Sequence, residues 1–358
     1  MDTATLLEKY AIGERDFSGI DLSWADLKQV DLPAVDFWEA DLSDADLSQA
    51  NLTGTNFKAA TLTRTNLTET TLTAADLRST DLSDANLQAA NLQTALYDRM
   101  TRFPANFDPA IASAYLIAPQ SVLQKASLAH TDLSGADLSH ADLRQANLQQ
   151  ASLFGVSLRQ ANLSTAALQN TDLHEADLQN ANLSGAKLSH ARLTDAKLQY
   201  ADLSGTTLTA ADLTGAILWK ANLFGADLRT AILQAANLQG AVYDNRTQFP
   251  ADYHPEQHGA YLIAPYASLQ RADLGGVTLS GADLTGADLT KANLTAADLW
   301  GANLTQANLT DANLTDANVW GANLTETNLR GANLTGIDLQ VAALTDAILD
   351  TPGLAADG

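Results

Sequence analysis

The sequence predicts an all-β fold in which the chain winds into a four-sided parallel β-helix. Leu or Phe recurs at nearly every fifth residue from Phe17 to Leu92, from Leu123 to Leu238 and from Leu269 to Leu349. A small residue, usually Ala, stands two positions before each of these centres. A period of five fits neither an α-helix nor a flat strand. We therefore expect a coil with corners, whose five-residue sides each point one small and one large apolar side chain inward.

The spacing of the aromatic residues predicts how many sides each turn has. Phe17, Phe37 and Phe57 occupy the Leu position at intervals of 20 residues. Trp300 and Trp320 share another position of the repeat and are also 20 residues apart. Four sides of five residues make one 20-residue turn, so the members of each set are expected to stack.

The other three letters of the repeat face solvent. Asp or Asn usually comes directly before the centre, and an Asn there is expected to pair amide to amide with the coil above, as in stacked strands. The two letters after the centre vary and are expected to be free of packing constraints. Any specific function is therefore expected at these variable letters and where the period is interrupted.

This pattern resembles the pentapeptide repeat family, whose consensus is A(D/N)LXX. The stretch "ANLTQANLTDANLTDANVWGANLT" at residues 302–325 repeats that consensus almost without change. The resemblance implies a right-handed quadrilateral parallel β-helix. The entry segment "LLEKYAIGERDF" is similar to long family members abundant in cyanobacteria, whose individual roles are mostly unknown.

The period divides the chain into three repeat blocks. We expect a short N-terminal helix capped by Thr3 or Thr5, whose Leu6, Leu7 and Tyr10 cover the first coil. The predicted parts are the helical cap 1–16, repeat block 1 at 17–97, the first excursion 98–122, repeat block 2 at 123–243, the second excursion 244–268, repeat block 3 at 269–350, and the tail 351–358.

The two excursions resemble each other. Residues 97–123 and 243–269 match at 14 of 27 positions, 146 residues apart. Asp108-Pro109 and His254-Pro255 predict a short helix in each. The excursions are either inserted packing elements or binding loops. Their aromatic residues are candidate contact residues in the second interpretation: Phe103, Phe107, Tyr115, Phe249, Tyr253 and Tyr261.

The acidity suggests an alternative function. The formal net charge is −22, which disfavours direct binding of nucleic acid because that depends on Lys and Arg at phosphates. The resemblance implies a second hypothesis, since some family members mimic DNA and inhibit DNA gyrase. The acidic surface for it is a run of ladder positions: Asp16, Asp21, Asp26, Asp31, Asp36, Asp41 and Asp46. Against a continuous mimic, block 2 places Lys187, Arg192 and Lys197 in ladder positions.

Catalysis, cofactors and metal binding are not predicted. The chain has no Cys, no Gly-rich phosphate loop and no nucleophile or zinc motif. His254 and His258 are four residues apart, but the first excursion has no such pair. The N-terminus does not read as a signal peptide and no apolar run is long enough to span a membrane, so a cytoplasmic protein is expected.

The function expected from the sequence is that of a non-enzymatic, rod-shaped protein-interaction scaffold with an unknown partner. Trp300 and Trp320 are the first candidates for contact, because they follow a Leu and are expected to point outward, and Trp is enriched at interface hot spots. The final segment "LDTPGLAADG" offers no helical pattern to cover the last coil. The resemblance therefore also implies a homodimer through the C-terminal coil.

Overall fold

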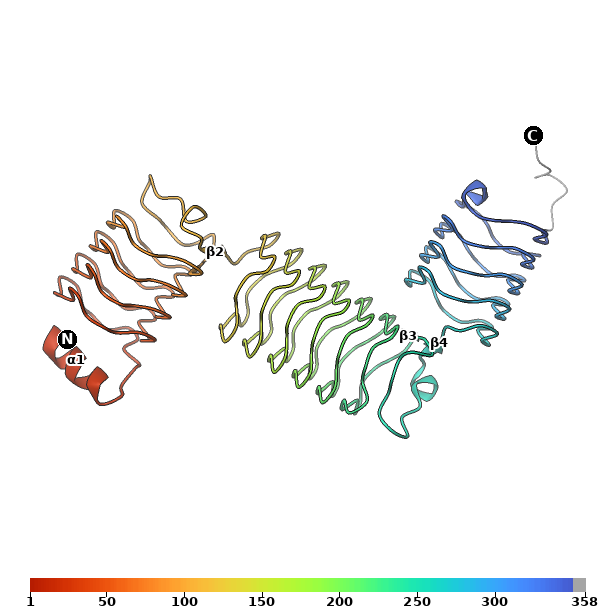
Figure 1. Ribbon diagram of the computed structural model, residues 1–358, viewed down its shortest axis with the longest axis horizontal. Coiled ribbons are helices and arrows are strands. Elements are labelled where there is room, and N and C mark those ends of the chain that lie inside the picture. Colours follow the sequence, from red (N-terminus) through yellow and green to blue (C-terminus); the bar gives the residue numbers. More distant parts are fainter. Residues whose placement is uncertain (350–358) are drawn as a thin grey trace. The chain divides into compact units, whose positions relative to one another are not determined.

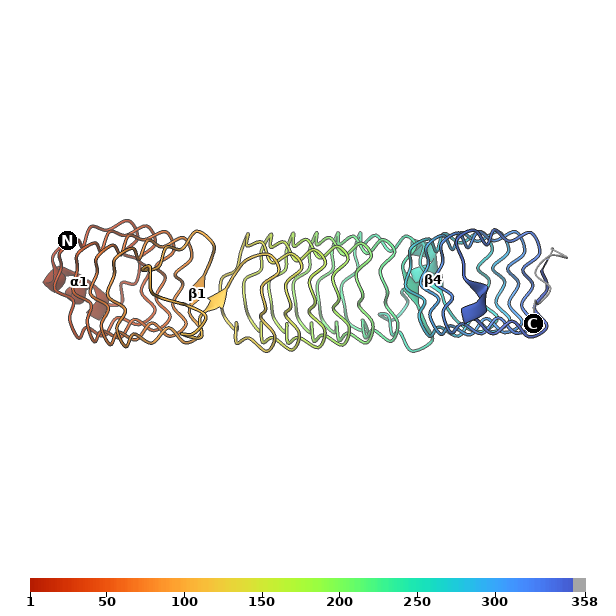
Figure 2. The same ribbon diagram turned by 90° about the horizontal axis from the view of Figure 1, so that it is seen from above.

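A computed structural model describes residues 1–349 as two compact units. The first unit contains Met1–Ser127 and Ala136–Leu143, and the second contains Leu128–Gly135 and the chain from Arg144 onward. Within each unit the chain winds into coils that lie side by side (Figures 1 and 2).

The turn of 20 residues predicted from the sequence is confirmed. Isolated parallel bridges join residues 20 positions apart throughout the repeat blocks, as between Asp16 and Asp36 or between Asn293 and Asn313. The rings of Phe17, Phe37 and Phe57 stack in a column, with centroids 6.2 and 5.7 Å apart. Each side of a coil therefore pairs with the same side of the next coil.

The interior of each unit is a column of buried Leu and Ala side chains. Almost every Leu at the centre of a repeat is fully buried, and most small residues two positions before are buried too. Thr also occupies the small position without leaving an unpaired hydroxyl. Thr65 and Thr70, for example, donate to the carbonyls of Leu42 and Leu47 at 2.8 Å. These hydrogen bonds remove the penalty of burying a polar group.

The corners constrain the last letter of the repeat more than the sequence indicated. The N–H of Ala25 donates to the carbonyl of Leu22, which closes a turn, and Trp24 has a φ of +63°. The same left-handed conformation recurs at nearly every corner, and Gly301 adopts it with a φ of +61°. A third turn residue with positive φ is typical of a type II turn and favours Gly. The letter faces solvent and varies as expected, but its backbone conformation favours Gly, a constraint that the sequence pattern did not indicate.

The ladder of polar residues is mainly a ladder of amides and carboxylates. Asn51 donates to Asp31 at 2.7 Å and Asn293 donates to Asp273 at 2.9 Å, each one coil away. The same carboxylate oxygen often accepts a backbone N–H two residues further along, as Asp273 does from Gly275. A pairing of two amides, from Asn328 to Asn308, is longer at 3.3 Å. The amide-to-amide ladder predicted from the sequence is thus a minor feature.

The chain begins with helix α1, Thr3–Ala11, which covers the first coil through Leu6. Its N-cap is Asp2, whose carboxylate accepts the N–H of Thr5 at 2.8 Å, so the predicted cap by Thr3 or Thr5 was wrong. Leu6 is fully buried in the core of the first unit, whereas Leu7 is exposed.

Both excursions start as one more coil that contains an extra residue. Asp81 pairs with Arg102, and Asp227 pairs with Gln248. Both pairs are 21 residues apart in the sequence, instead of the 20 residues of a regular coil. Short parallel strands then close each coil. In the first excursion β1 (Leu96–Tyr97) pairs with β2 (Tyr115–Leu116), and in the second β3 (Val242–Tyr243) pairs with β4 (Tyr261–Leu262).

The helix predicted in each excursion is present in only one of them. The second excursion contains the 3₁₀ helix η1, Pro255–His258, with Pro255 at its start. Residues 109–113 of the first excursion form turns, and Asp108 accepts the N–H of Ala110 at 2.9 Å. A second short 3₁₀ helix, η2 (Leu339–Val341), lies near the end of block 3.

Candidate interaction site

Each excursion joins two repeat blocks, and we call this region a junction. The aromatic residues of each excursion pack against one another within its own junction. Phe103 lies edge-on to Tyr97 and is stacked on Phe107, with centroids 5.6 and 5.3 Å apart. Both Phe rings contact the core of the first unit. In the second excursion Phe249 packs in the same way against Tyr243 and Tyr253. This inward packing weakens their candidacy as contact residues.

One tyrosine ties each excursion to the block that follows it. The hydroxyl of Tyr115 accepts the N–H of Ser127, and that of Tyr261 accepts the N–H of Asp273, both at 3.2 Å. His258 stacks in parallel on Tyr253 at 4.8 Å, so burial against the ring stack raises the pKa of Tyr253. These contacts give the aromatic residues a structural task at the junction.

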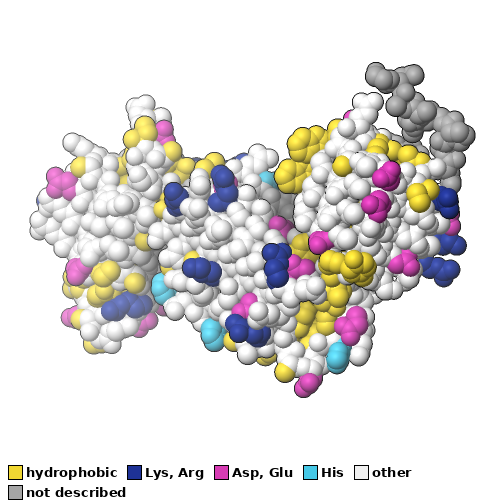
Figure 3. Space-filling model, turned by 45° about the vertical axis from the view of Figure 1, so that its right-hand side comes forward, with side chains coloured by type: hydrophobic (Ala, Val, Ile, Leu, Met, Phe, Trp, Pro, Cys, Tyr) yellow, Lys and Arg dark blue, Asp and Glu magenta, His cyan; other side chains and the backbone are white. Residues whose placement is uncertain are grey.

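Trp300 and Trp320 form an exposed stack on the second unit. Their ring planes are 2° from parallel with centroids 5.9 Å apart, and the residues are 50% and 56% exposed. The N–H groups of Gly281 and Gly301 donate to the carbonyls of Trp300 and Trp320, which stacks the three corners in one column. We call this column, Ser280–Gly281, Trp300–Gly301 and Trp320–Gly321, the Trp corner. Apolar side chains also interrupt the polar surface in the view of Figure 3.

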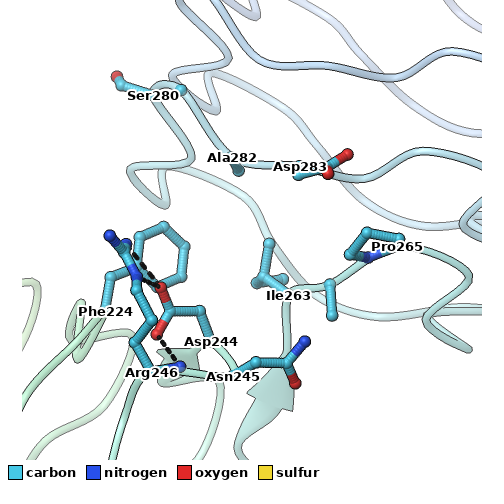
Figure 4. Close-up of a pocket in the computed structure, with 11 residues that line it drawn as sticks. Phe224, Asp244, Asn245, Arg246, Ile263, Pro265, Ser280, Ala282 and Asp283 are labelled. Carbon is cyan, nitrogen blue, oxygen red and sulfur yellow. Dashed lines mark hydrogen bonds and ion pairs between the residues drawn. The ribbon is translucent and has the colours of Figure 1, made fainter.

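A pocket of about 340 Å³ opens at the foot of the Trp corner, where block 2 meets block 3. Phe224 and the ion pair of Asp244 with Arg246 (2.7 Å) lie on its block 2 side. Ile263 lies between these residues and Asp283 from the first coil of block 3 (Figure 4). The pocket was not predicted, because it depends on how two blocks meet.

The pocket exists because the ladder is interrupted at this junction. β4 pairs with β3 on one edge, and within residues 1–349 its other edge has no strand partner. Asp283, at the start of block 3, forms a bridge with Asn303 in the next coil. Within the described residues it forms no bridge with the preceding coil. An unpaired strand edge of this kind is a template for another extended segment.

A buried lysine ties block 2 to block 3 at the first coil of block 3. The Lys220 side chain is only 7% exposed, and its Nζ lies 3.0 Å from Asp273 and 2.9 Å from the carbonyl of Gly275. Trp219 places its ring 5.3 Å from the same nitrogen. Burial acts to raise the pKa of Asp273, but hydrogen bonds from Lys220 and Gly275 hold it below its ordinary value.

The acidic ladder of the first unit is short. Three bridges place one Asp over another, namely Asp16 with Asp36, Asp21 with Asp41 and Asp26 with Asp46. The next coil opposes Asp31, Asp36, Asp41 and Asp46 with Asn or Thr. Hydrogen bonds from the hydroxyl and N–H of the serine two residues on lower the pKa of Asp16 and Asp21. Much of this acidity therefore serves to cap turns.

The positive ladder residues of block 2 also stand in register. Bridges stack Arg192 over Asp172 and Lys197 over Asp177, and Arg192 lies 3.7 Å from the Asp172 carboxylate. Across residues 1–349, His, Asp and Glu form no group of three or more suited to hold a metal ion. His254 lies 3.4 Å from Glu256 and is exposed.

The stacked coils and their exposed corners define a class of protein, a β-helical repeat protein that presents side chains in columns on its surface. Pentapeptide repeats match in eight copies, at residues 20–58, 55–93, 121–160, 157–195, 191–229, 267–306, 292–331 and 322–350. These cover most of the sequence, and the chain belongs to the pentapeptide repeat family. Members of this family fold as right-handed β-helices and are generally structural or interaction proteins.

Several solved structures are similar to this chain over part or nearly all of its length. The pentapeptide repeat protein alr5209 from Nostoc PCC 7120 is 44% identical over 32% of this chain and 95% of its own length, with a TM-score of 0.32. HetL, from the same organism and involved in regulating heterocyst differentiation, is 26% identical over 99% of both chains, with a TM-score of 0.21. Rfr23 from Cyanothece 51142 is 34% identical over 30% of this chain and 63% of its own, with a TM-score of 0.15.

No curated protein matches the sequence. No helix within the described residues has the length and apolar character needed to cross a membrane.

Proposed function

We propose that this protein is a non-enzymatic interaction scaffold that binds a protein partner through the Trp corner. The supporting observation is the parallel stack of Trp300 and Trp320, half-exposed on a backbone fixed by interstrand hydrogen bonds. Large aromatic side chains held rigidly lose little conformational entropy on binding and are enriched at interface hot spots. The pocket beside Ser280 adds a recess at the end of the exposed stack.

Capture from a cell lysate tests this proposal. Wild-type protein, a Trp300→Ala/Trp320→Ala double variant and a Phe154→Ala variant are immobilised, and bound proteins are identified by mass spectrometry. Phe154 is the matched control because it is also an exposed corner aromatic, stacked at 5.6 Å on His174. We expect a partner that is lost with the double variant and retained with Phe154→Ala, and that binds again when purified.

Two outcomes of the capture experiment would contradict this proposal. A partner retained equally by all three proteins contradicts the Trp corner as the binding site. Recovery of DNA gyrase subunits with all three proteins, released by salt, supports mimicry of DNA by the acidic surface instead.

A further inference from the structure

The basic side chains of block 3 gather at one corner. Its only Lys and Arg residues are Arg271, Lys291 and Arg330. Backbone hydrogen bonds between successive coils stack all three at one corner, two sides away from Trp300. Because a coil has four corners, the basic residues of this block stand diagonally opposite the Trp corner.

Acidic side chains occur all around block 3, including Asp273, Asp288 and Asp311 away from the Trp corner, but the half that carries the Trp corner holds acidic side chains and none of the basic ones of this block. The bridges and backbone hydrogen bonds place the acidic residues of that half on the two sides that meet at the Trp corner, or at the two adjacent corners: Asp283, Asp298, Asp316, Glu326 and Asp346. No Lys or Arg of block 3 lies among them. Exposed charges interact over a Debye length of about 8 Å at physiological salt. The indole rings therefore share their half of the block with unneutralised carboxylates rather than with cations.

One of these carboxylates lies where the pocket and the Trp corner meet. Asp283 lines the pocket and accepts hydrogen bonds from the N–H and hydroxyl of Thr285, at 3.1 and 2.6 Å. Within residues 1–349 no Lys or Arg forms an ion pair with it. On the block 2 side of the pocket, by contrast, Arg246 is already paired with Asp244 at 2.7 Å. The net charge that the pocket offers a ligand is thus negative.

The spacing of the rings fits an extended chain. Side chains on one face of a β-strand repeat every second residue, or about 6.6 Å. The centroids of Trp300 and Trp320 are 5.9 Å apart along the stack. Successive side chains on one face of a strand can therefore each meet one indole ring. Arg and Lys bind favourably over the face of a Trp ring because the ring quadrupole attracts a cation there, and a nearby carboxylate adds to that attraction.

We propose that the Trp corner binds an extended segment of a partner protein in which Arg or Lys occupies every second position, with one of these side chains reaching Asp283. This inference rests on the proposed function and specifies the chemistry of its partner.

Block 2 supplies an internal control for the inference. Phe154 and His174 form a stack at the positions 146 residues before Trp300 and Trp320, with centroids 5.6 Å apart. The sides and corner next to that pair carry Arg159, Arg192 and Lys197. Arg192 and Arg159 already occupy the carboxylates of Asp172 and Asp177 there, at 3.7 and 3.1 Å, so this aromatic pair is not expected to bind a basic segment.

The test uses labelled eight-residue peptides of known sequence and fluorescence anisotropy with the full-length protein. One peptide alternates Arg with Ser, a second alternates Glu with Ser, and a third has four Arg followed by four Ser. We expect the alternating Arg peptide to bind, the Glu peptide to fail, and the block peptide to bind more weakly. Trp300→Ala/Trp320→Ala should weaken binding about tenfold, and Asp283→Asn about threefold.

Two matched variants decide whether the site is specific. Asp311→Asn removes one negative charge at the corner occupied by Lys291, and Phe154→Ala removes the other exposed pair; neither should change the affinity. Equal losses for Asp283→Asn and Asp311→Asn, or no loss for the double Trp variant, overturn the inference. Equal affinity for the block peptide overturns the extended arrangement. If lysate capture depends on the Trp corner but these peptides do not, the inference fails while the proposed function stands.

Discussion

The two excursions are bound into the protein by the same contacts. Asp98 accepts the N–H groups of Ser79 and Thr101 at 2.9 Å, and Asp244 accepts those of Gly225 and Thr247 at 2.9 and 3.1 Å. The Tyr115 and Tyr261 hydroxyls accept a backbone N–H at equivalent positions, as described above. The shared sequence thus encodes a way to insert one long coil and restart the stack.

The residues that differ between the excursion regions are those that give the second one its pocket and its contact of Lys220 with Asp273, which we call the latch. Where the second has Phe224 in the pocket, the position 146 residues earlier is Arg78, which is buried and paired with Asp76. Where the second has Lys220, the earlier position is Ala74. The comparison indicates that the inserted coil itself has a structural role. The pocket and the Lys220–Asp273 contact are additional features of the second region alone.

The largest expected effect concerns the shared carboxylates. Asp98→Ala and Asp244→Ala each remove a charged acceptor from several N–H groups that are partly buried, so each should lower the free energy of unfolding by about 3 kcal/mol. Denaturant unfolding with hydrogen exchange at the affected amides measures both. Clearly unequal losses at the two positions would contradict the view that the junctions share one design.

The latch should matter only at the second junction. Lys220→Met leaves Asp273 without its cation, and because Asp273 is 55% exposed the remaining carboxylate can be hydrated. We expect a loss of about 1–2 kcal/mol, below that for breaking a fully buried pair.

Lys291→Met is the control for the latch. Lys291 is 53% exposed and lies 3.9 Å from Asp311, so its replacement should change stability by less than about 0.5 kcal/mol. Equal effects from the two lysines would show that burial of Lys220 contributes nothing.

The regular part of the fold was predictable because every repeat buries the same two side chains, the central Leu and the small residue two positions before it. The 20-residue spacing of Phe17, Phe37 and Phe57 was enough to give the number of sides. The position of Arg271, Lys291 and Arg330 at one corner follows from the same 20-residue spacing. The stack of Trp300 and Trp320 follows from the same rule.

The junctions were not predictable from the period. The inward packing of Phe103 depends on the one extra residue in the coil, which changes the direction of the following side chains. Lys220 occupies a variable letter that normally faces water, and it is buried only because block 3 meets it there. Neither the latch nor the pocket is encoded in any single repeat.

A smaller effect is expected from the tyrosine hydroxyls. Tyr115→Phe and Tyr261→Phe keep the ring packing and remove one hydrogen-bond acceptor, so each should cost about 1 kcal/mol. Exchange of the amide hydrogens of Ser127 and Asp273 reports the two sites separately. Protection lost at one amide and unchanged at the other would mean that the shared sequence forms different junctions.

The smallest effect is a dependence on pH that only the second junction should show at its latch. The pKa of Asp273 is lowered below its ordinary value of 3.8 by Lys220 and the other hydrogen bonds, against the opposing effect of burial. A carboxylate whose folded pKa is lowered stabilises the fold above its unfolded pKa, and this stabilisation is lost as the pH falls through the folded pKa. The difference in stability between wild type and Lys220→Met should therefore be constant from pH 7 to about 5 and shrink below about 4. Because both proteins keep Asp98 and Asp244, the acid titration of those groups cancels in the comparison.

Unfolding measured at each pH gives the difference directly, and a difference that stays constant down to pH 2.5 would show that the Asp273 charge plays no part in closing the junction. Ser127 stands at the corresponding place in the first junction, and with no carboxylate there the protection of its amide should not follow this latch titration.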